Sequence, residues 1–455
     1  MRPSVSLALA SLVGVSEAAA LAGPISWLRW LRPGGGQHVL GAGDAAATPV
    51  SPPDSLLSAS GFVSFGDSYS AGIGTGVNGN EEDCRRGDHA YPVLLRDDLD
   101  AARGPDAPAA VTFQWLSCTG ASTEDLLAGG ARSQIDAFNA SLGADFATLS
   151  MGGNDLGFFD VMNACIFRFY SFYSGTCDAA LARAEAALAA PALDQRLLVA
   201  LLQILDRAPW EKKPGFAVAV TGYARFFRDD TPACDDCSLA VWRQPGPKLT
   251  RATRRRTSDL VVGLNGKLRG AVAAVNARFA RRPPRAVFVD YDAVFAGHRL
   301  CEPGVREPDY QRDATWFFLV GGADSGQNGT APPNGTASDV AAEALSPLSP
   351  LVDPERCLGP ARRSGDWGRL AVCYMAMARH RDPSLRPAHD RILNANSMWY
   401  VPTYYGKTFH PVSSPGTWCV RERPYLQVTC SDPRAMMRSG TVSTRHGGTT
   451  VCDVA

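Results

Sequence analysis

The sequence has no excess of charge of either sign, because its 45 Lys and Arg residues equal its 45 Asp and Glu residues. A chain without a global basic field has no long-range attraction for the phosphate backbone of nucleic acids. It has no acidic bias either. We therefore expect no nucleic-acid partner and a substrate that is small or neutral.

Long hydrophobic runs are also missing, apart from the N-terminus. The opening stretch "MRPSVSLALASLVGVSEAAALAG" has one arginine, a short apolar segment and then small residues in an A-x-A pattern. This pattern is typical of a secretory signal and is too short to span a bilayer, although a buried N-terminal helix is the alternative. We interpret residues 1–22 as a signal peptide cleaved after Ala20 or Ala22. The prediction is a secreted, extracellular monomer without an integral membrane segment.

A second Cys-x-x-Cys motif is absent, although the chain has twelve cysteines. Without it, Cys234-Asp-Asp-Cys237 is weak evidence for a zinc site or a redox pair, and a structural disulfide is the better interpretation. An even set of cysteines in a secreted chain usually forms disulfides. The pairs that lie close in sequence are Cys165 with Cys177, Cys234 with Cys237, Cys357 with Cys373 and Cys419 with Cys430.

Composition divides the chain into segments. Residues 23–59 are rich in Gly, Pro, Ala and Ser and are interpreted as a flexible leader, so the folded domain should begin near Ser60. Residues 321–350 are of low complexity and are expected to form a glycosylated surface loop. Sequons at Asn139, Asn328 and Asn334 agree with the secretory route.

Short apolar runs alternate with helical patterns in the folded region. The runs at 61–65, 111–116, 145–150, 215–221 and 285–290 predict five buried parallel strands. Helical spacing occurs between them at 91–102, 132–142, 177–208 and 257–280. This alternation predicts a three-layer α/β/α sandwich with a five-stranded, doubly wound, flavodoxin-like parallel sheet.

Polar groups follow three of these strands, at the sheet edge where α/β proteins bind ligands. Ser68 follows the first run in Gly66-Asp67-Ser68, and Gly120 follows the second in a tight turn. Asn154 follows the third, behind two glycines that allow close approach to a ligand. Nucleophilic acyl transfer requires a serine hydroxyl near a base, together with backbone and amide N–H donors.

Two other motifs, a nucleotide-binding loop and an α/β-hydrolase elbow, are incomplete in this region. Residues 74–79 satisfy G-x-G-x-x-G, but they lack the strand–turn–helix context of a nucleotide-binding loop, and no Gly-Lys-Ser/Thr follows. The Gly-x-Ser-x-Gly elbow of α/β-hydrolases is also absent, since Ser70 occupies the last position of that pattern.

The blocks Gly66-Asp67-Ser68, Gly120, Gly152-Gly153-Asn154-Asp155 and Phe409-His410-Pro411 occur in this order. In this the chain resembles the SGNH, or GDSL-type, hydrolase family over roughly residues 60–415, and we place an SGNH hydrolase domain at 60–420. The resemblance implies that Ser68 is the nucleophile and His410 its base. It also implies that Ser68 N–H, Gly120 N–H and the Asn154 amide form the oxyanion hole. Residues 421–455 lie outside it, as a disulfide-linked C-terminal extension.

Histidine is scarce, with seven in the chain, and His410 alone has the His-Pro context of the family. We interpret His89 as a surface residue and His298 as structural or substrate-lining, and His389 has only a sequence-adjacent aspartate. The family's orienting aspartate is replaced by Lys407. We therefore predict a Ser–His dyad in which the Lys407 backbone carbonyl orients the ring, or an acid supplied from elsewhere in the fold.

The favoured function is a secreted serine carboxylic-ester hydrolase, of the esterase or lipase type, that acts on lipid, aryl or polysaccharide acyl esters. The alternative is a non-catalytic SGNH-fold protein that binds lipids or acylated polysaccharide, since the aspartate is missing. No cofactor and no metal are expected, because the base and the donors of this chemistry are protein groups. The sequence does not define the acyl chain or the alcohol.

Overall fold

The structure is a computed structural model that describes residues 59–76, 83–104, 107, 109–170, 175–279, 285–309, 312, 314–320, 352–386, 405–412, 428–429 and 451–452. These residues belong to the compact unit Ala47–Ala455. Several predicted features lie outside the described residues: the signal peptide, almost all of the leader, the loop at 321–350, the pairing of Cys419 with Cys430 and most of the C-terminal extension.

A parallel five-stranded sheet forms the centre of the described unit. Its strands are β1 (Gly61–Gly66), β2 (Thr112–Trp115), β3 (Phe146–Ser150), β4 (Ala217–Thr221) and β5 (Ala286–Val289), in the order β2-β1-β3-β4-β5. The five predicted strands and the flavodoxin-like sheet are therefore confirmed. The chain reverses direction across the sheet between β1 and β3, which is where doubly wound folds bind their ligands.

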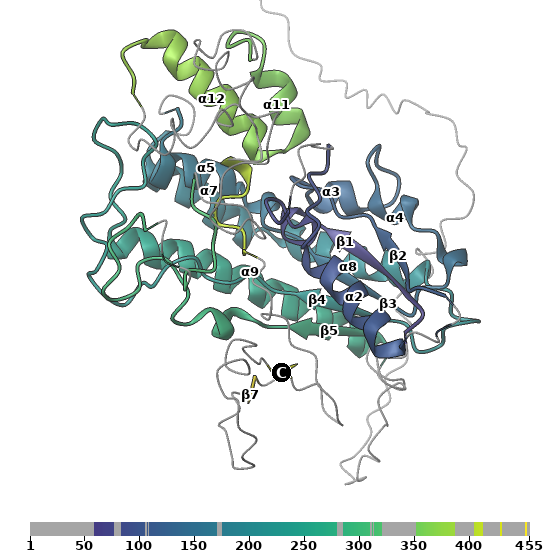
Figure 1. Ribbon diagram of the computed structural model, residues 1–455. Helices are drawn as coiled ribbons and strands as arrows, with labels where there is room; N and C mark the ends of the chain where they lie inside the picture. Colours follow the sequence, from purple (N-terminus) through teal and green to yellow (C-terminus); the bar gives the residue numbers. More distant parts are fainter. Residues whose placement is uncertain are drawn as a thin grey trace, which may run out of the picture. The chain divides into compact units, whose positions relative to one another are not determined.

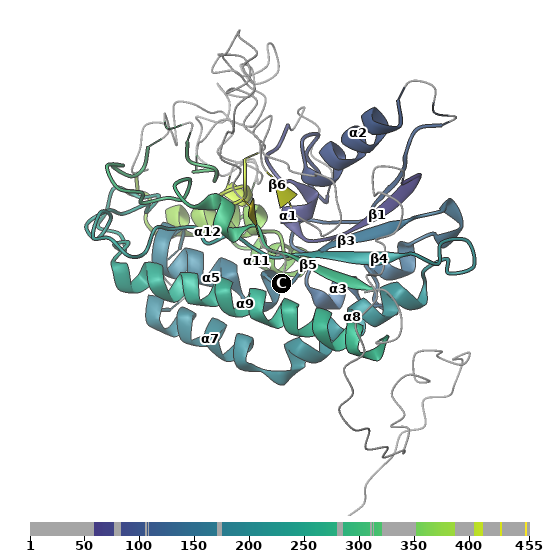
Figure 2. The same cartoon turned by 90° about the horizontal axis from the view of Figure 1, so that it is seen from below.

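Both faces of the sheet are covered, which is why the strand sequences are almost wholly apolar. All six residues of β1 are buried. Phe62 packs in one core with Leu99 of α2, whereas Val63 and Phe65 belong to the larger core on the other face. Figure 2 shows α2 on one face and α8 and α9 on the opposite face, which gives the three layers predicted.

The helices in the first part of the chain are α1 (Ser68–Ala71), α2 (Tyr91–Arg103), α3 (Thr123–Leu126), α4 (Gln134–Ala137) and α5 (Phe158–Met162). Later helices are α7 (Cys177–Ala189), α8 (Pro191–Asp206), α9 (Arg251–Arg278), α11 (Leu358–Ser364) and α12 (Trp367–Arg381). Short 3₁₀ turns span Ala140–Leu142, Asn154–Leu156 and Asp292–Phe295, and a π turn spans Asn163–Phe167. A separate two-stranded pair, β6 (Val428–Thr429) and β7 (Val451–Cys452), is antiparallel.

Three predicted helices differ from the observed ones. The segment 177–208 is two helices, because Pro191 has no backbone N–H and starts α8 at its first turn. The segment 132–142 breaks into α4 and a 3₁₀ turn, because the Asn139 side chain accepts the backbone N–H of Ser141 and competes with helix continuation. Helix α9 begins earlier than predicted, where the Thr250 hydroxyl caps it.

Two predicted disulfides are confirmed, Cys165–Cys177 and Cys357–Cys373. The pairing of Cys234 with Cys237 is wrong, because Cys234 bonds to Cys301 and Cys237 keeps a free thiol. In this segment a backbone hydrogen bond from Cys237 N–H to the Cys234 carbonyl, rather than a disulfide, closes the turn. The remaining disulfide, Cys84–Cys118, was not anticipated.

Helices α11 and α12 form a hairpin whose turn is Gly365 and Asp366. Figure 1 shows this hairpin beside α5, and Phe159 of α5 packs against Trp367 and Tyr374 of α12. Within the described residues no single helix is both long and apolar enough to cross a membrane, although α7 and α8 together pass that test and are bent by 53° where they meet.

Candidate active site

Ser68 lies directly beyond the carboxyl end of β1, where the strand turns into the short helix α1. A side chain at Gly66 would approach the Ser150 carbonyl of β3 to 2.6 Å, so this turn requires glycine. The Asp67 carboxylate accepts the Tyr69 N–H at 3.0 Å and caps α1. The Gly-Asp-Ser sequence therefore serves to hold the Ser68 hydroxyl at the tip of the sheet.

His410 contacts Ser68, although the two residues lie far apart in the sequence. Its Nε2 atom lies 2.7 Å from Ser68 Oγ, although the two residues are 342 positions apart. The backbone around His410 is fixed on both sides, because the His410 carbonyl accepts Phe318 N–H at 3.0 Å and the His410 N–H is donated to the Lys407 carbonyl at 2.9 Å. The structure thus brings together the serine and histidine that the sequence singled out.

The Nδ1 side of the His410 ring faces a backbone carbonyl. His410 Nδ1 lies 3.2 Å from the Thr408 carbonyl, whereas the Lys407 carbonyl accepts the main-chain N–H of His410. The turn through Phe409, which has a φ of 63°, directs Thr408 toward the ring. The carbonyl within hydrogen-bond distance of Nδ1 is that of Thr408, and the predicted Lys407 carbonyl has a smaller effect on the pKa of the ring in the same direction. No carboxylate among the described residues forms a hydrogen bond with this imidazole.

Burial controls the charge of His410. The side chain is enclosed, and desolvation lowers its pKa to about 4, against the opposing effect of the Thr408 and Lys407 carbonyls. At neutral pH the ring is therefore uncharged. With Nδ1 facing a carbonyl, the proton resides on Nδ1 and the lone pair of Nε2 faces the Ser68 hydroxyl.

Of the predicted oxyanion donors, Asn154 lines one cavity together with Ser68 and His410, and Gly120 lines an adjoining cavity together with Asn154. Asn154 Nδ2 donates one N–H to the Ala121 carbonyl at 2.8 Å, which leaves its second N–H for a ligand. Gly120 has a φ of 83°, and within the described part of the chain neither its N–H nor that of Ser68 has a hydrogen-bond acceptor. Backbone N–H groups without an acceptor are the kind of donor that can stabilise an oxyanion.

Two cavities adjoin at the site. The first measures about 40 Å³ and is lined by Ser68, His410, Asn154 and a set of mostly apolar residues. The second measures about 440 Å³ and includes Gly120 in its wall. Asn154, Phe158 and Trp367 line both cavities, so they separate a small reactive chamber from a space within the usual range for bound small molecules.

Sequence reasoning missed Tyr223, which follows β4. Its hydroxyl donates to Asp67 Oδ2 at 2.5 Å and accepts the Gly153 N–H at 3.3 Å. Burial raises the pKa of Asp67 to about 7, while the Tyr223 hydrogen bond acts in the opposite direction. The only sequence signal was the position of Tyr223 just beyond a strand end.

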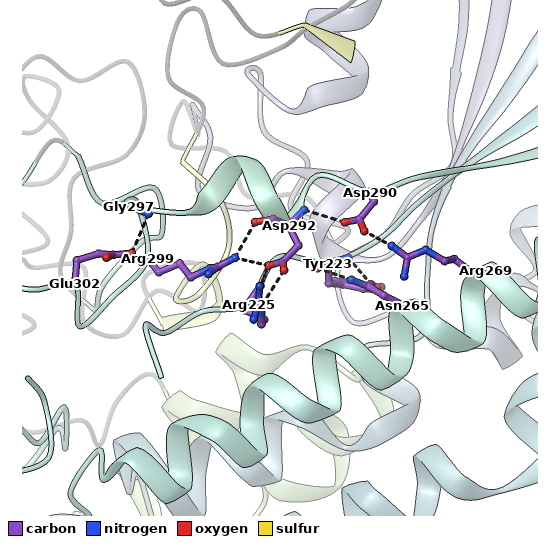
Figure 3. A network of polar contacts seen from close by, with 9 residues as sticks. All are labelled: Tyr223, Arg225, Asn265, Arg269, Asp290, Asp292, Gly297, Arg299 and Glu302. Carbon is purple, nitrogen blue, oxygen red and sulfur yellow. Dashed lines mark hydrogen bonds and ion pairs between the residues drawn. The ribbon is translucent and has the colours of Figure 1, made fainter. Parts of the chain in front are cut away.

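Tyr223 is itself fixed by its backbone. The Asn265 side chain of α9 accepts Tyr223 N–H at 2.8 Å and donates to its carbonyl at 2.9 Å (Figure 3). Further along, Asp292 accepts hydrogen bonds from Arg225 and Arg299, which ties the segment after β4 to the segment after β5 (Figure 3). These contacts hold the phenol ring next to Asp67.

The other histidines lie elsewhere. His89 is exposed, and His298 stacks on Trp316 with 3.6 Å between ring centroids, which fits its structural interpretation. His389 lies outside the described residues. Among the residues that the structure describes, no group of three or more His, Cys, Asp or Glu side chains is arranged to hold a metal ion.

Comparison with known proteins identifies the relatives of this chain, although no protein-family model matches it. It is 30% identical over 263 residues to a lipase of Streptomyces rimosus, which covers 56% of this chain and 78% of that protein. It is 31% identical over 244 residues to lipase 1 of Streptomyces coelicolor, covering 53% and 74% of the two chains. The crystal structure of phospholipase A1 from Streptomyces albidoflavus has 30% identity and a TM-score of 0.38 over 53% of this chain and 84% of that one.

The relationship rests on the two lipases, because each match extends over more than two thirds of the relative. The matching blocks Gly66-Asp67-Ser68, Gly120, Asn154-Asp155 and His410 agree with it. The chain therefore belongs to the SGNH, or GDSL-type, hydrolase family and is a carboxylic-ester hydrolase.

Proposed function

We propose that this enzyme cleaves esters with a Ser68–His410 dyad in which the Thr408 carbonyl takes the place of an orienting acid. The observation that carries the proposal is the 2.7 Å distance between Ser68 Oγ and His410 Nε2. At this distance the neutral imidazole accepts the hydroxyl proton as Oγ attacks the substrate carbonyl carbon. A carbonyl fixes the tautomer as a carboxylate would, but it supplies no full charge to stabilise the imidazolium.

The reaction proceeds by two acyl transfers, first to Ser68 and then to water. Attack by Ser68 Oγ gives a tetrahedral intermediate whose oxyanion accepts hydrogen bonds from Ser68 N–H, Gly120 N–H and Asn154 Nδ2–H. His410 returns the proton to the leaving alcohol, and the acyl group remains on Ser68. A water molecule, deprotonated by His410 Nε2, attacks the acyl carbon and releases the carboxylic acid and the free serine.

The cavities suggest how the substrate lies. The small chamber of about 40 Å³ accommodates the reacting carbonyl and a few neighbouring atoms. The larger space of about 440 Å³ takes the remainder, since the two share the walls formed by Asn154, Phe158 and Trp367. Because the curated relatives are lipases, we propose a lipid ester as the substrate, with acylated polysaccharide as the second candidate. A series of nitrophenyl esters from acetyl to palmitoyl measures the acyl preference.

The proposal includes secretion. The apolar N-terminal segment with its A-x-A pattern supports export, and the disulfides of the described domain suit an oxidising compartment. N-terminal sequencing of the protein from the culture medium should give a chain that starts directly after Ala20 or Ala22. A chain retained inside the cell with its N-terminus intact would contradict this part of the proposal.

Active-site labelling tests the nucleophile. An organophosphonate should modify Ser68 alone, and Ser68→Ala should abolish ester hydrolysis while the unfolding temperature stays close to that of the wild type. The matched control is Ser70→Ala, which removes a nearby buried hydroxyl bonded to Ser64 and Ser117. This variant should keep its labelling. Modification of Ser70 instead of Ser68 would overturn the assignment of the nucleophile. A wild-type protein that is neither labelled nor able to hydrolyse esters would also overturn it, and would favour a binding protein.

A further inference from the structure

The hairpin formed by α11 and α12 lies outside the strand–helix alternation of the fold, yet its turn touches the loop that carries Gly120. A side chain at Gly120 would meet the carbonyl group of Gly365 at 2.6 Å, and one at Gly365 would meet the Gly120 carbonyl oxygen at 2.6 Å. Both residues have positive φ angles, 83° and 69°. The two backbones are therefore in direct contact, and each position requires glycine.

A buried ion pair fixes the hairpin in this position. Arg85 Nε lies 2.6 Å from Asp366 Oδ2, and both side chains are 3% exposed. Arg85 adjoins Cys84, which is joined by a disulfide to Cys118, two residues before Gly120. The Thr119 N–H also donates to the Cys84 carbonyl at 3.1 Å. The hairpin turn and the Gly120 loop are thus anchored to the same short segment.

Trp367, the first residue of α12, reaches the other predicted donor. Its indole Nε1–H donates to Asn154 Oδ1 at 3.2 Å, while Asn154 Nδ2 donates to the Ala121 carbonyl at 2.8 Å. An indole N–H can only donate and a carbonyl can only accept, so these two partners determine which end of the amide is oxygen and which is nitrogen. Neither of these two partners uses the second N–H of Asn154.

Loss of the indole N–H would remove one of these two constraints. An amide rotated by half a turn would present its oxygen, rather than an N–H, to the oxyanion, and the interaction would become repulsive. Trp367 also lines both cavities, and its ring lies 5.9 Å from that of His410 in an edge-to-face arrangement. The packing and the hydrogen bond of Trp367 therefore have to be separated in a test.

We propose that Trp367 is a positioning residue of the oxyanion hole, which acts through Asn154 by holding its amide in the donating orientation. The inference rests on the proposed function, since it takes Asn154 as a donor to the transition state. It gives the hairpin a part in positioning a donor of the proposed oxyanion hole.

The first test is Trp367→Phe, which keeps an aromatic ring and removes the N–H. We expect kcat to fall about tenfold, less than the roughly 10²–10³-fold loss from Asn154→Ala, with little change in KM. The matched control is Trp210→Phe, because that indole donates to the Leu205 carbonyl at 2.8 Å and does not line either cavity. It should leave both constants unchanged. A rise in KM with constant kcat would show that Trp367 is only a wall of the cavity.

A double-mutant cycle separates positioning from general damage. In an Asn154→Ala background, Trp367→Phe should have almost no further effect on kcat, because the residue it positions is gone. If the phenylalanine variant does not fold, Trp367→3-benzothienylalanine removes the N–H at nearly constant ring shape and takes its place. Additive losses, or an unchanged kcat in Asn154→Ala, would overturn the inference. If Ser68→Ala is inactive in the same experiments, the proposed nucleophile stands regardless.

Discussion

The Tyr223 hydroxyl lies 2.5 Å from the Asp67 carboxylate, and it joins two loops that carry the reacting groups. Asp67 precedes Ser68 and caps α1, while the second partner of the hydroxyl, Gly153 N–H, precedes Asn154. One phenol group therefore connects the nucleophile loop after β1 with the Asn154 loop after β3. This connection lies at the reversal point of the sheet, where the two strands are neighbours.

Tyr223→Phe should lower kcat by about tenfold, because small misplacements of reacting groups reduce rates by up to roughly 10²-fold. It should also raise the pKa of Asp67 further, since the Tyr223 hydrogen bond favours the carboxylate form. Steady-state kinetics measure the first effect. The control is Tyr291→Phe, whose hydroxyl has no hydrogen-bond partner among the described residues and should be dispensable. Equal kinetics for the two variants would argue against a role of the Tyr223 bridge.

The pH profile should reflect the buried, neutral His410. Because its pKa is lowered from 6.5 to about 4, kcat/KM should rise with pH through about 4 and stay level above pH 6. Initial rates of hydrolysis of an uncharged ester, measured between pH 3 and pH 8, give this profile. A midpoint well above 7, together with an acidic residue whose removal matches the loss at His410, would establish a conventional triad instead.

The same shift has a consequence for stability. As the pH falls below 6.5 the unfolded chain takes up a proton at this histidine before the folded chain does, so the free energy of unfolding decreases between pH 6.5 and about 4. Urea unfolding at several pH values should show a weaker dependence in His410→Asn than in the wild type. An identical dependence in both proteins would mean that His410 titrates normally in the fold.

The Lys407 side chain should be dispensable for catalysis. It is buried, and its Nζ lies 5.2 Å from the ring centroid of Phe318 rather than beside His410. Lys407→Ala should therefore keep most of kcat/KM, whereas His410→Ala should lose nearly all of it. Lys407→Asp should not improve the rate, because the Thr408 carbonyl already occupies the Nδ1 side of the ring. A large gain in Lys407→Asp would show that the carbonyl is a poor substitute for the family acid.

Asp366→Ala should destabilise the fold, because it removes the carboxylate that forms a buried ion pair with Arg85. Breaking a buried pair in this way costs about 3–5 kcal/mol of unfolding free energy. Asp366→Asn keeps an oxygen for the N–H groups of Gly368 and Arg369 that Asp366 caps, so it separates the charge from the cap. The control is Asp230→Ala, which breaks an exposed pair with Arg228 and should change stability little. Equal unfolding midpoints for Asp366→Ala and the control would contradict the anchoring role of the ion pair.

The sheet was predictable from sequence because its strands are short apolar runs with polar or glycine residues at their ends. Phe62, Phe65 and their neighbours must face two cores at once, which leaves little room for another interpretation. Helix limits were less predictable where one residue decides them. Pro191 divides a long alanine-rich and leucine-rich segment whose helical pattern continues on both sides.

Within the site, the sequence identified the residues that lie in family motifs, but it did not identify the residues that hold them in place. Ser68 and His410 have local sequence contexts, whereas Tyr223 and Trp367 act through contacts made only in the folded chain. The approach of the Thr408 carbonyl to Nδ1 depends on the turn at Phe409, whose positive φ has no signature in the sequence. Likewise Cys234 bonds to a cysteine 67 positions away instead of its sequence neighbour.

The separation of 342 residues between Ser68 and His410, the proposed nucleophile and base, would also govern when the enzyme can first act. Synthesis proceeds from the N-terminus at about 5–20 residues per second, so roughly 17 to 70 seconds pass between the incorporation of Ser68 and that of His410. All five strands of the sheet have been made by then. On the proposed mechanism, a chain that ends before His410 contains all five strands and Ser68 but lacks the base that activates the serine. On this mechanism, ester hydrolysis would require that translation has passed His410 and that the segment carrying it has docked.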